Sequence, residues 1–489
     1  MLKRAGYLSL LIVATLFAVC LPTASIWAAS NSNASAQTLN AVTHPAAILC
    51  LVIFVLSYVA VLMEEYTHMR KSKPVLLGAG LIWVIIGMIA PSYGIDHDTL
   101  HSAIFHGLEE YASLLLFLLA AMTYISALEE RNVFAVLKSN LIRSGLNFRQ
   151  LFWATGLIAF FLSPVADNLT TALVLGAVVV AVGSNNPRFV SLACINVVSA
   201  ANAGGAFSPF GDITTLMVWQ SGNVSFFEFF NLFLPSVICF LIPAAIMSVF
   251  IPRDYPEALK EDVSLRHGAR MIIALGVFTI AMAVGFEQTL GLPPFVGMMF
   301  GLSFLMIAAY VIRHVWVNKD EDKDFDILEN VAAAEWDTLL FFFGVIFSVG
   351  GLAFLGYMEL ASAAMYQEFG ASATNIVLGV SSAIIDNIPV MFAVLSMNPE
   401  MDHFQWLLIT LTTGVGGSML SIGSAAGVAL MGVARGQYTF MSHLKWTPVI
   451  VLGYISAIGV HFLINSHLMN VSIHAIDVTT HIEEPAPTH

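Results

Sequence analysis

The sequence predicts an all-α polytopic membrane protein made of two inverted five-span repeats, each with a re-entrant hairpin and a broken helix. The prediction rests on the composition, on recurrent apolar stretches and on an internal repeat. Of the 489 residues, 58% are hydrophobic and 10% are charged, whereas soluble proteins average roughly 45–50% and 25%. The apolar stretches run for about twenty residues, the length that a helix needs to cross a bilayer. A soluble globular domain is therefore excluded.

The charge balance narrows the class of partner. The chain has 19 Lys and Arg against 32 Asp and Glu, a net charge of −13, so it offers no basic surface for nucleic acid. It also lacks glycine-rich phosphate-binding motifs. We therefore expect the lipid bilayer and small ions as partners, no nucleic acid, no ATP-driven step and no cofactor.

The first segment, 1–29, resembles a secretory signal peptide. Lys3 and Arg4 precede an apolar run from Tyr7 to Cys20, and small residues follow up to Ser30. An uncleaved first helix is the alternative. In either case the polar stretch 31–43 emerges outside the membrane.

The remaining apolar stretches give the spans. Their expected ranges are 46–64, 75–92, 111–128, 229–251, 271–290, 295–312, 336–355 and 446–466, with two broken regions at 150–222 and 373–434.

Orientation follows from the basic residues, which concentrate in short cytoplasmic loops. All 19 can lie on the cytoplasmic side of one alternating topology, including those in the loop 70–73 after the first span. This requires that 150–183 enters and returns from the cytoplasm and that 373–399 does so from outside. The external loops 93–110 and 356–372 then carry no Lys or Arg. The mature N-terminus and the tail 467–489 would be extracytoplasmic.

Three segments recur in the same order along the chain. Residues 110–115 match 335–340, residues 163–168 match 382–387, and residues 202–205 match 414–417. The first unit is expected at 45–251 and the second at 271–466, with a cytoplasmic linker at 252–270. Each unit contributes five spans, an odd number, so the second unit must be inverted relative to the first.

Two carboxylates stand at the expected hairpin tips, and ionisable residues at membrane depth are candidates for function. They are Asp167 and Asp386, each followed by an asparagine, Asn168 and Asn387. Carboxylate, amide and freed carbonyl oxygens are the hard ligands that a small cation needs. We expect Na⁺ to bind at Asp167 and Asp386. A helix cap is the structural alternative for either aspartate.

The second broken segment of each unit carries further polar residues. Asn202, Asp212, Thr214 and Thr215 lie in the first, and Ser421 and Ser424 in the second; Ser382 precedes the second hairpin tip. Asp212 as a simple N-cap and the glycines as close-packing positions are the alternatives.

Acids at the starts of two equivalent spans are accessory candidates. Glu110, Glu335 and Asp337 could lie on a proton path or could simply be solvated at span ends. The histidines between 97 and 106 and the acidic cluster 320–326 are expected in solvated loops.

The paired Asp-Asn tips, the segment Gly-Gly-Ala-Phe-Ser-Pro-Phe-Gly-Asp-Ile-Thr-Thr and the segment Gly-Gly-Ser-Met-Leu-Ser-Ile-Gly-Ser together resemble the NhaD-type sodium/proton antiporters of the ion-transporter superfamily. The resemblance covers nearly the whole chain after the signal-like segment. It implies that the polar membrane residues named above form the ion path, with Glu110, Glu335 and Asp337 as accessory acids. It also implies a place in a bacterial inner membrane and pairing into a homodimer.

The resemblance further implies export of Na⁺, with Li⁺ as a second cation, in exchange for external protons, a role in pH and sodium homeostasis. A carboxylate in a low-dielectric cavity favours its protonated form, so a proton and a sodium ion can compete for one site. Rocking of one repeat assembly against the other would alternate access. An anion carrier for dicarboxylate, citrate or arsenite on the same scaffold is the alternative. A membrane-embedded enzyme is disfavoured, because no metal-ligand spacing of His, Asp and Glu occurs within the spans.

Overall fold

The computed structural model describes residues 38–183, 185–256, 263–314 and 325–469. Every regular element in these ranges is helical. The longer helices are α2 (Pro45–Leu62), α4 (Ser72–Ile89), α5 (His97–Glu130), α6 (Val133–Arg143), α7 (Phe148–Ala166), α8 (Asn168–Val182), α9 (Pro187–Gly205), α10 (Ile213–Gln220), α11 (Phe233–Ser248), α12 (Ala269–Leu290), α13 (Pro294–His314), α15 (Trp336–Phe354), α17 (Ala371–Ser381), α18 (Asn387–Met397), α19 (His403–Gly416), α20 (Ala425–Val433) and α22 (Thr447–Ile464). The signal-like segment 1–29 and the tail from residue 470 lie outside the described residues.

Nine helices of the described ranges are long and apolar enough to cross a bilayer. They correspond to α2, α4 with the following turn, α5, α7, α11 with the preceding turn, α12, α13, α15 and α22. The shorter apolar helices α8, α17 and α18 lie in the two broken regions. The predicted class, an all-α polytopic membrane protein, is confirmed.

Both expected external loops contain helix. The predicted loop 356–372 holds α16 (Tyr357–Ser362) and a further helical turn, Ala363–Gln367. Most of the predicted external loop 93–110 is helical, because α5 begins at His97 and continues for 34 residues. The Asp96 side chain caps this helix by accepting a hydrogen bond from the Thr99 amide at 2.9 Å. The first turns of α5 are polar, so a search for apolar stretches detects only its second half.

Both hairpin regions break at the expected aspartates. Asp167 alone separates α7 from α8, and these two helices pack against each other. Asp386 immediately precedes α18, which packs against α17. Further breaks separate α9 from α10 and α19 from α20. In the first of these, Pro209 removes a backbone donor that a continuous helix would need.

Two helices at matching positions in the predicted repeats form the core. Helices α9 and α19 are buried along almost their whole length and pack on each other. Helices without a polar face are stable only when covered on all sides. Accordingly α7 and α8 pack on α9, while α17 and α18 pack on α19.

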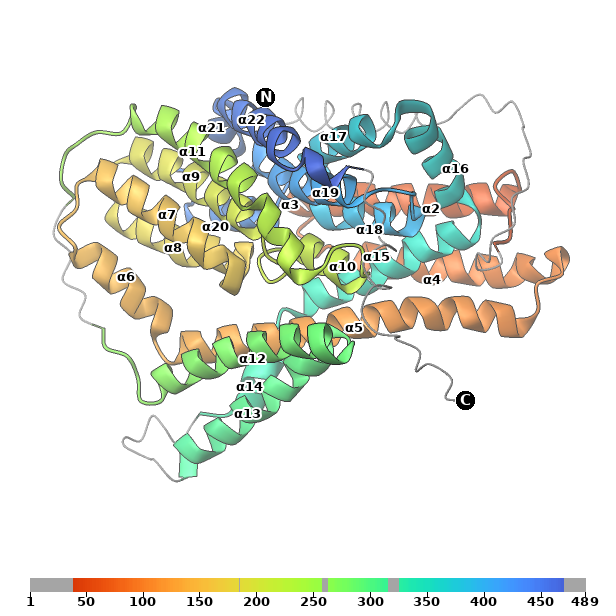
Figure 1. Cartoon of the computed structure of the whole chain (residues 1–489), viewed down its shortest axis with the longest axis horizontal. Helices are drawn as coiled ribbons and strands as arrows, with labels where there is room; N and C mark the ends of the chain where they lie inside the picture. Colours follow the sequence, from red (N-terminus) through yellow and green to blue (C-terminus); the bar gives the residue numbers. More distant parts are fainter. Residues whose placement is uncertain (1–37, 184, 257–262, 315–324, 470–489) are drawn as a thin grey trace, which may run out of the picture.

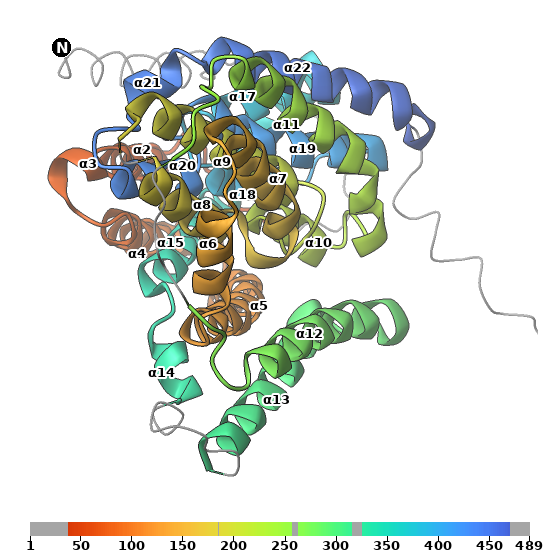
Figure 2. The same cartoon turned by 90° about the vertical axis from the view of Figure 1, so that its left-hand side faces the viewer.

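The outer helices exchange partners between the two halves of the chain. Helix α4 packs on α15, α13 packs on α5, and α11 packs on α22. Two similar units related by a two-fold axis would pack in this reciprocal way. In Figures 1 and 2 the antiparallel pair α12 and α13 projects from the rest of the molecule below α5.

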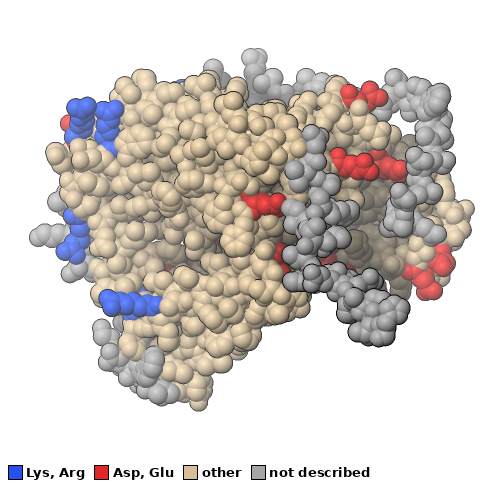
Figure 3. Space-filling view, in the orientation of Figure 1, with Lys and Arg blue, Asp and Glu red and all other residues tan. Residues whose placement is uncertain are grey.

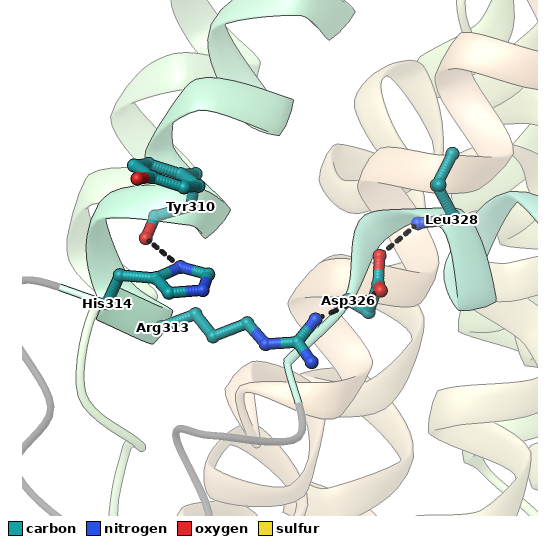
Figure 4. Close-up of polar contacts among 5 residues, drawn as sticks. All are labelled: Tyr310, Arg313, His314, Asp326 and Leu328. Atoms are coloured by element: carbon teal, nitrogen blue, oxygen red, sulfur yellow. Dashed lines mark hydrogen bonds and ion pairs between the residues drawn. The ribbon is translucent and has the colours of Figure 1, made fainter.

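Charge is separated along the long axis. On the face in Figure 3, Lys and Arg gather at the left-hand end, and most Asp and Glu lie toward the other end. At the junction of α13 with the short helix α14 (Ile327–Ala332), Arg313 pairs with Asp326 at 3.0 Å, and Asp326 accepts a hydrogen bond from the Leu328 amide (Figure 4). This member of the acidic cluster therefore closes a loop between two helices.

Glycine pairs allow the close approach of backbones at the breaks. A Cβ atom on Gly204 would collide with the Phe160 carbonyl of α7, and one on Gly416 would collide with the Gly379 carbonyl of α17. Gly205 and Gly417 meet the backbone of Gly211 and Gly423 in the same way. These glycines therefore act as close-packing positions, the structural alternative given above.

Gly204→Ala is expected to lower the free energy of unfolding by about 1–3 kcal/mol, because the added methyl group meets main-chain atoms that cannot rotate away. Thermal unfolding in detergent measures the effect. Gly80→Ala is the matched control: this glycine of α4 has no atom within 4 Å of the built Cβ, so its unfolding temperature should not fall. Equal behaviour of the two variants would contradict the packing account.

Candidate functional site

The central feature of the site is the Asp212 carboxylate, which joins both hairpin tips. Asp212 is 5% exposed and caps α10 by accepting a hydrogen bond from the Thr214 amide at 3.2 Å. Its Oδ2 atom accepts hydrogen bonds from Asn168 Nδ2 at 3.1 Å and from Asn387 Nδ2 at 2.9 Å. One carboxylate oxygen thus connects the first residue of α8 with the first residue of α18.

Asn202 extends this network into the second half of the chain. Its side-chain oxygen accepts a hydrogen bond from Asn168 at 3.1 Å, and its amide donates to Ser418 Oγ at 2.9 Å. Asn202 is fully buried in α9, and Ser418 lies in the turn that follows α19. We call the set Asn168, Asn202, Asp212, Asn387 and Ser418 the polar hub.

Asp167 occupies a strained position beside the hub. Its backbone has φ +56° and ψ 164°, a region that residues other than glycine rarely adopt at a cost of about 1–3 kcal/mol. The Thr170 amide and hydroxyl donate to its two carboxylate oxygens at 2.7 and 2.9 Å. The side chain therefore caps α8 and at the same time holds a carboxyl group at the tip of the hairpin.

Asp386, the matching residue of the second hairpin, has different surroundings. It makes no cap hydrogen bond, and its Oδ1 atom is buried without a hydrogen-bond partner. Its Oδ2 atom lies 3.6 Å from Lys71 Nζ. Among the described residues, no hydrogen bond or ion pair joins Asp386 to Asp167, so the two aspartates form separate halves of the site.

The hydroxyl candidates fall into two groups. Thr215 donates to the Asp212 and Ser208 carbonyls, and Ser382 donates to the Gly379 and Thr413 carbonyls, so both hold the backbone at the breaks. Ser424 caps α20.

Thr214 and Ser421 form the second group. Their side chains are fully buried, and their hydroxyl oxygens have no hydrogen-bond partner. Such oxygens are free to contact a bound cation.

The accessory acids are also divided. Glu335 precedes α15 and lies close enough to Asp167 to act on it electrostatically. Asp337 accepts a hydrogen bond from the Ser72 hydroxyl at 2.5 Å. Glu110 instead lies within α5, is 46% exposed and pairs with His106. The structure therefore places Glu110 in the middle of a long helix rather than at its start, and its ion pair does not involve the hub.

Three site residues were missed by the sequence analysis. Thr170 follows Asp167 by three residues, a spacing typical of helix caps, and this signal could have found it. Ser418 lies within the serine-rich segment but was not singled out. Nothing in the sequence indicated that Lys71 belongs to the site, because a basic residue that follows a span is expected in a cytoplasmic loop.

Comparison with known proteins places the chain in a family. A family model described as "Citrate transporter" matches residues 58–414. The Na(+)/H(+) antiporter NhaD of Vibrio cholerae is 55% identical over 435 residues, which cover 85% of this chain and 91% of that protein. The chain belongs to the NhaD family.

Further relatives come from another bacterium and from a plant. The Na(+)/H(+) antiporter NhaD of Alkalimonas amylolytica is 52% identical over 90% of this chain and 95% of its own length. Sodium/proton antiporter 1 of Arabidopsis thaliana is 31% identical over 85% of this chain and 72% of its own length. The relatives are transporters, so this NhaD-family chain is a transporter and not an enzyme.

The hub of this NhaD-family chain can hold a small cation. It brings one carboxylate and three amide side chains together in a buried place, with Asp167 and Asp386 adjoining it in sequence. No cluster of three or more His, Cys, Asp and Glu suited to a transition metal occurs in the described ranges. Oxygen ligands in this arrangement suit a hard ion of low charge.

Thr170→Val is expected to lower the free energy of unfolding by about 1–2 kcal/mol, because Asp167 loses a hydrogen bond to a charged group in a buried place. Thr170→Ser retains the hydroxyl and should unfold close to the wild type. Differential scanning fluorimetry of the three purified proteins gives the comparison. If valine and serine at position 170 proved equally stable, this bond would not hold the hairpin tip.

Proposed function

We propose that this chain is a secondary antiporter that exports Na⁺ in exchange for external H⁺. The observation that carries the proposal is the convergence of both hairpin tips on the buried Asp212 carboxylate, through Asn168 and Asn387. The family supports it, since relatives at 50–56% identity bear the name Na(+)/H(+) antiporter. Li⁺ is the expected second cation, because the site offers the same oxygen ligands to it.

The charges favour a cation over citrate. Asp167, Asp212 and Asp386 place three acidic side chains at or beside the tips, and Lys71, the one basic partner among the described residues, is already paired with Asp386. A carrier for a multiply charged anion would need neutral or cationic groups at these positions. The anion alternative, which the broader family description retains, therefore has little support from the site.

Exchange follows from competition for the carboxylates. Low-dielectric surroundings favour the protonated form of a carboxyl group, and a deprotonated carboxylate attracts Na⁺. Asp167 and Asp386 are the proposed exchanging groups, with Na⁺ at both, and Asp212 completes the ion shell or relays the proton. Asn168 and Asn387 shape the tips. A proton that leaves one of these carboxyl groups on the cytoplasmic side is replaced by Na⁺ from that same side, and after access has switched, the sodium ion leaves outside in exchange for an external proton.

Alternating access is proposed to come from two inverted repeats, 45–251 and 271–466, joined by the linker 252–270. The reciprocal packing of α4 on α15 and α13 on α5 supports this division. The gathering of Lys and Arg at one end (Figure 3) supports a cytoplasmic side there. The proposed location is the bacterial inner membrane, with both mature termini extracytoplasmic, two copies pairing, and no cofactor.

The direct test is sodium-induced collapse of a proton gradient in inside-out vesicles. Na⁺ and Li⁺ should collapse the gradient with the wild-type protein, whereas Asp167→Asn and Asp386→Asn should each lower the response at least a hundred-fold, because an amide cannot exchange a proton. K⁺ and citrate serve as controls. A response to citrate without one to Na⁺ would establish the anion alternative.

Competition also predicts a pH dependence. In the range where the exchanging carboxyl group is protonated, the sodium concentration that gives half-maximal exchange should rise roughly ten-fold for each unit by which the pH falls. The maximal rate at saturating sodium should change less. Initial rates at several sodium concentrations and pH values measure both. A half-saturating concentration that did not depend on pH would contradict competition at one site.

A further inference from the structure

Lys71 lies at the hairpin tip although its position in the sequence suggests a loop. Its ammonium is 3.6 Å from Asp386 Oδ2, and the two side chains are 18% and 20% exposed. The same ammonium stands over the Phe341 ring, 4.6 Å from its centroid. A lysine in a solvated loop would make neither contact. It immediately precedes α4, and the next residue, Ser72, is bonded to Asp337 of α15.

The pair connects two groups of helices. Lys71 is the N-cap of α4, which packs on α2 and α15, whereas Asp386 lies between α17 and α18 of the second hairpin. Phe341, the other contact of the ammonium, lies on α15. The ion pair is therefore held on one side by the α4–α15 packing and on the other by the hairpin tip.

Few other groups compensate the Asp386 charge. Its Oδ1 atom has no hydrogen-bond partner, and the nearby Tyr58 hydroxyl of α2 is also without one. Of the other charged groups on the neighbouring elements, Lys73 of α4 is exposed, whereas Glu335 and Asp337 of α15 and Asp212 preceding α10 are acidic, and Asp212 interacts electrostatically with Asp386. Lys71 is thus the one cation that the described structure places against Asp386.

We propose that the Lys71 ammonium is a tethered cation that occupies Asp386 when no transported ion is bound and is displaced when Na⁺ enters. The proposal deepens the function given above and rests on it. No bond forms or breaks; one monovalent cation replaces another beside the same carboxylate. Such a lysine compensates the Asp386 carboxylate while no sodium ion is bound, and it raises the sodium concentration needed to fill the site.

One consequence follows from removal of the ammonium. At an alkaline pH, where protons compete weakly, Na⁺ no longer has to displace a tethered charge and should bind more tightly.

The test compares Lys71→Met and Lys71→Arg with the wild type, all as full-length protein in inside-out vesicles. The matched control is Lys73→Met, since Lys73 is two residues away and exposed. At the alkaline pH, Lys71→Met should lower the half-saturating sodium concentration about ten-fold. Lys71→Arg and Lys73→Met should remain within about two-fold of the wild type.

Two results would overturn the proposal. One is a Lys71→Met protein whose sodium dependence matches the wild type at the alkaline pH. The other is a folded Lys71→Met protein that has lost sodium binding, since the lysine would then be required for binding rather than competing with it. Sodium-dependent stabilisation against thermal unfolding in detergent reports binding without transport and separates the second result from a failure to fold.

Asp386→Asn in the same assay separates this proposal from the proposed function. If Asp386→Asn retained full exchange, the assignment of Asp386 as an exchanging group would fail, and the lysine proposal with it. If Asp386→Asn abolished exchange while Lys71→Met behaved as the wild type, only the lysine proposal would fail.

Discussion

The site depends on one carboxylate oxygen, Asp212 Oδ2, which accepts hydrogen bonds from the tips of both hairpins. Asn168 and Asn387 are the first residues of α8 and α18, so the hydrogen bonds from their side-chain amides fix where the two hairpin tips meet. A buried carboxylate is stable only when its lone pairs are satisfied. The folded arrangement of the hairpins and the position of the Asp212 carboxyl group therefore support each other, and a change at either end alters both.

The surrounding helices cover this meeting point with protein. Helices α9 and α19 are buried on almost every side, and each is interrupted beside the hub. Gly204 and Gly416 bring the backbones of α7 and α17 close to these interruptions. Irregular backbone at membrane depth is tolerated only where it lines a cavity or is covered by protein, and the glycine contacts provide that cover.

Much of this arrangement could be predicted from the sequence because it depends on local signals. Twenty-residue apolar stretches gave the spans, and the Asp-Asn pairs with the nearby Gly and Pro residues gave the breaks at Asp167 and Asp386. The extension of α5 to His97 was missed because its polar first turns resemble a loop. The Lys71–Asp386 pair was missed for a different reason: it joins residues 315 positions apart, and no local pattern encodes that contact. The different surroundings of Asp167 and Asp386 likewise arise from tertiary packing, although their sequence motifs are alike.

The central claim is that Na⁺ and H⁺ compete for the same buried carboxyl groups. Calorimetric titration of the purified protein with Na⁺, in two buffers of different ionisation enthalpy at one near-neutral pH, measures this most directly. The account predicts that about one proton or more is released for each sodium ion bound. The apparent binding enthalpies in the two buffers should then differ by that number of protons multiplied by the difference between the buffers' ionisation enthalpies. Sodium binding with the same enthalpy in both buffers would show that no proton leaves, and would contradict the account.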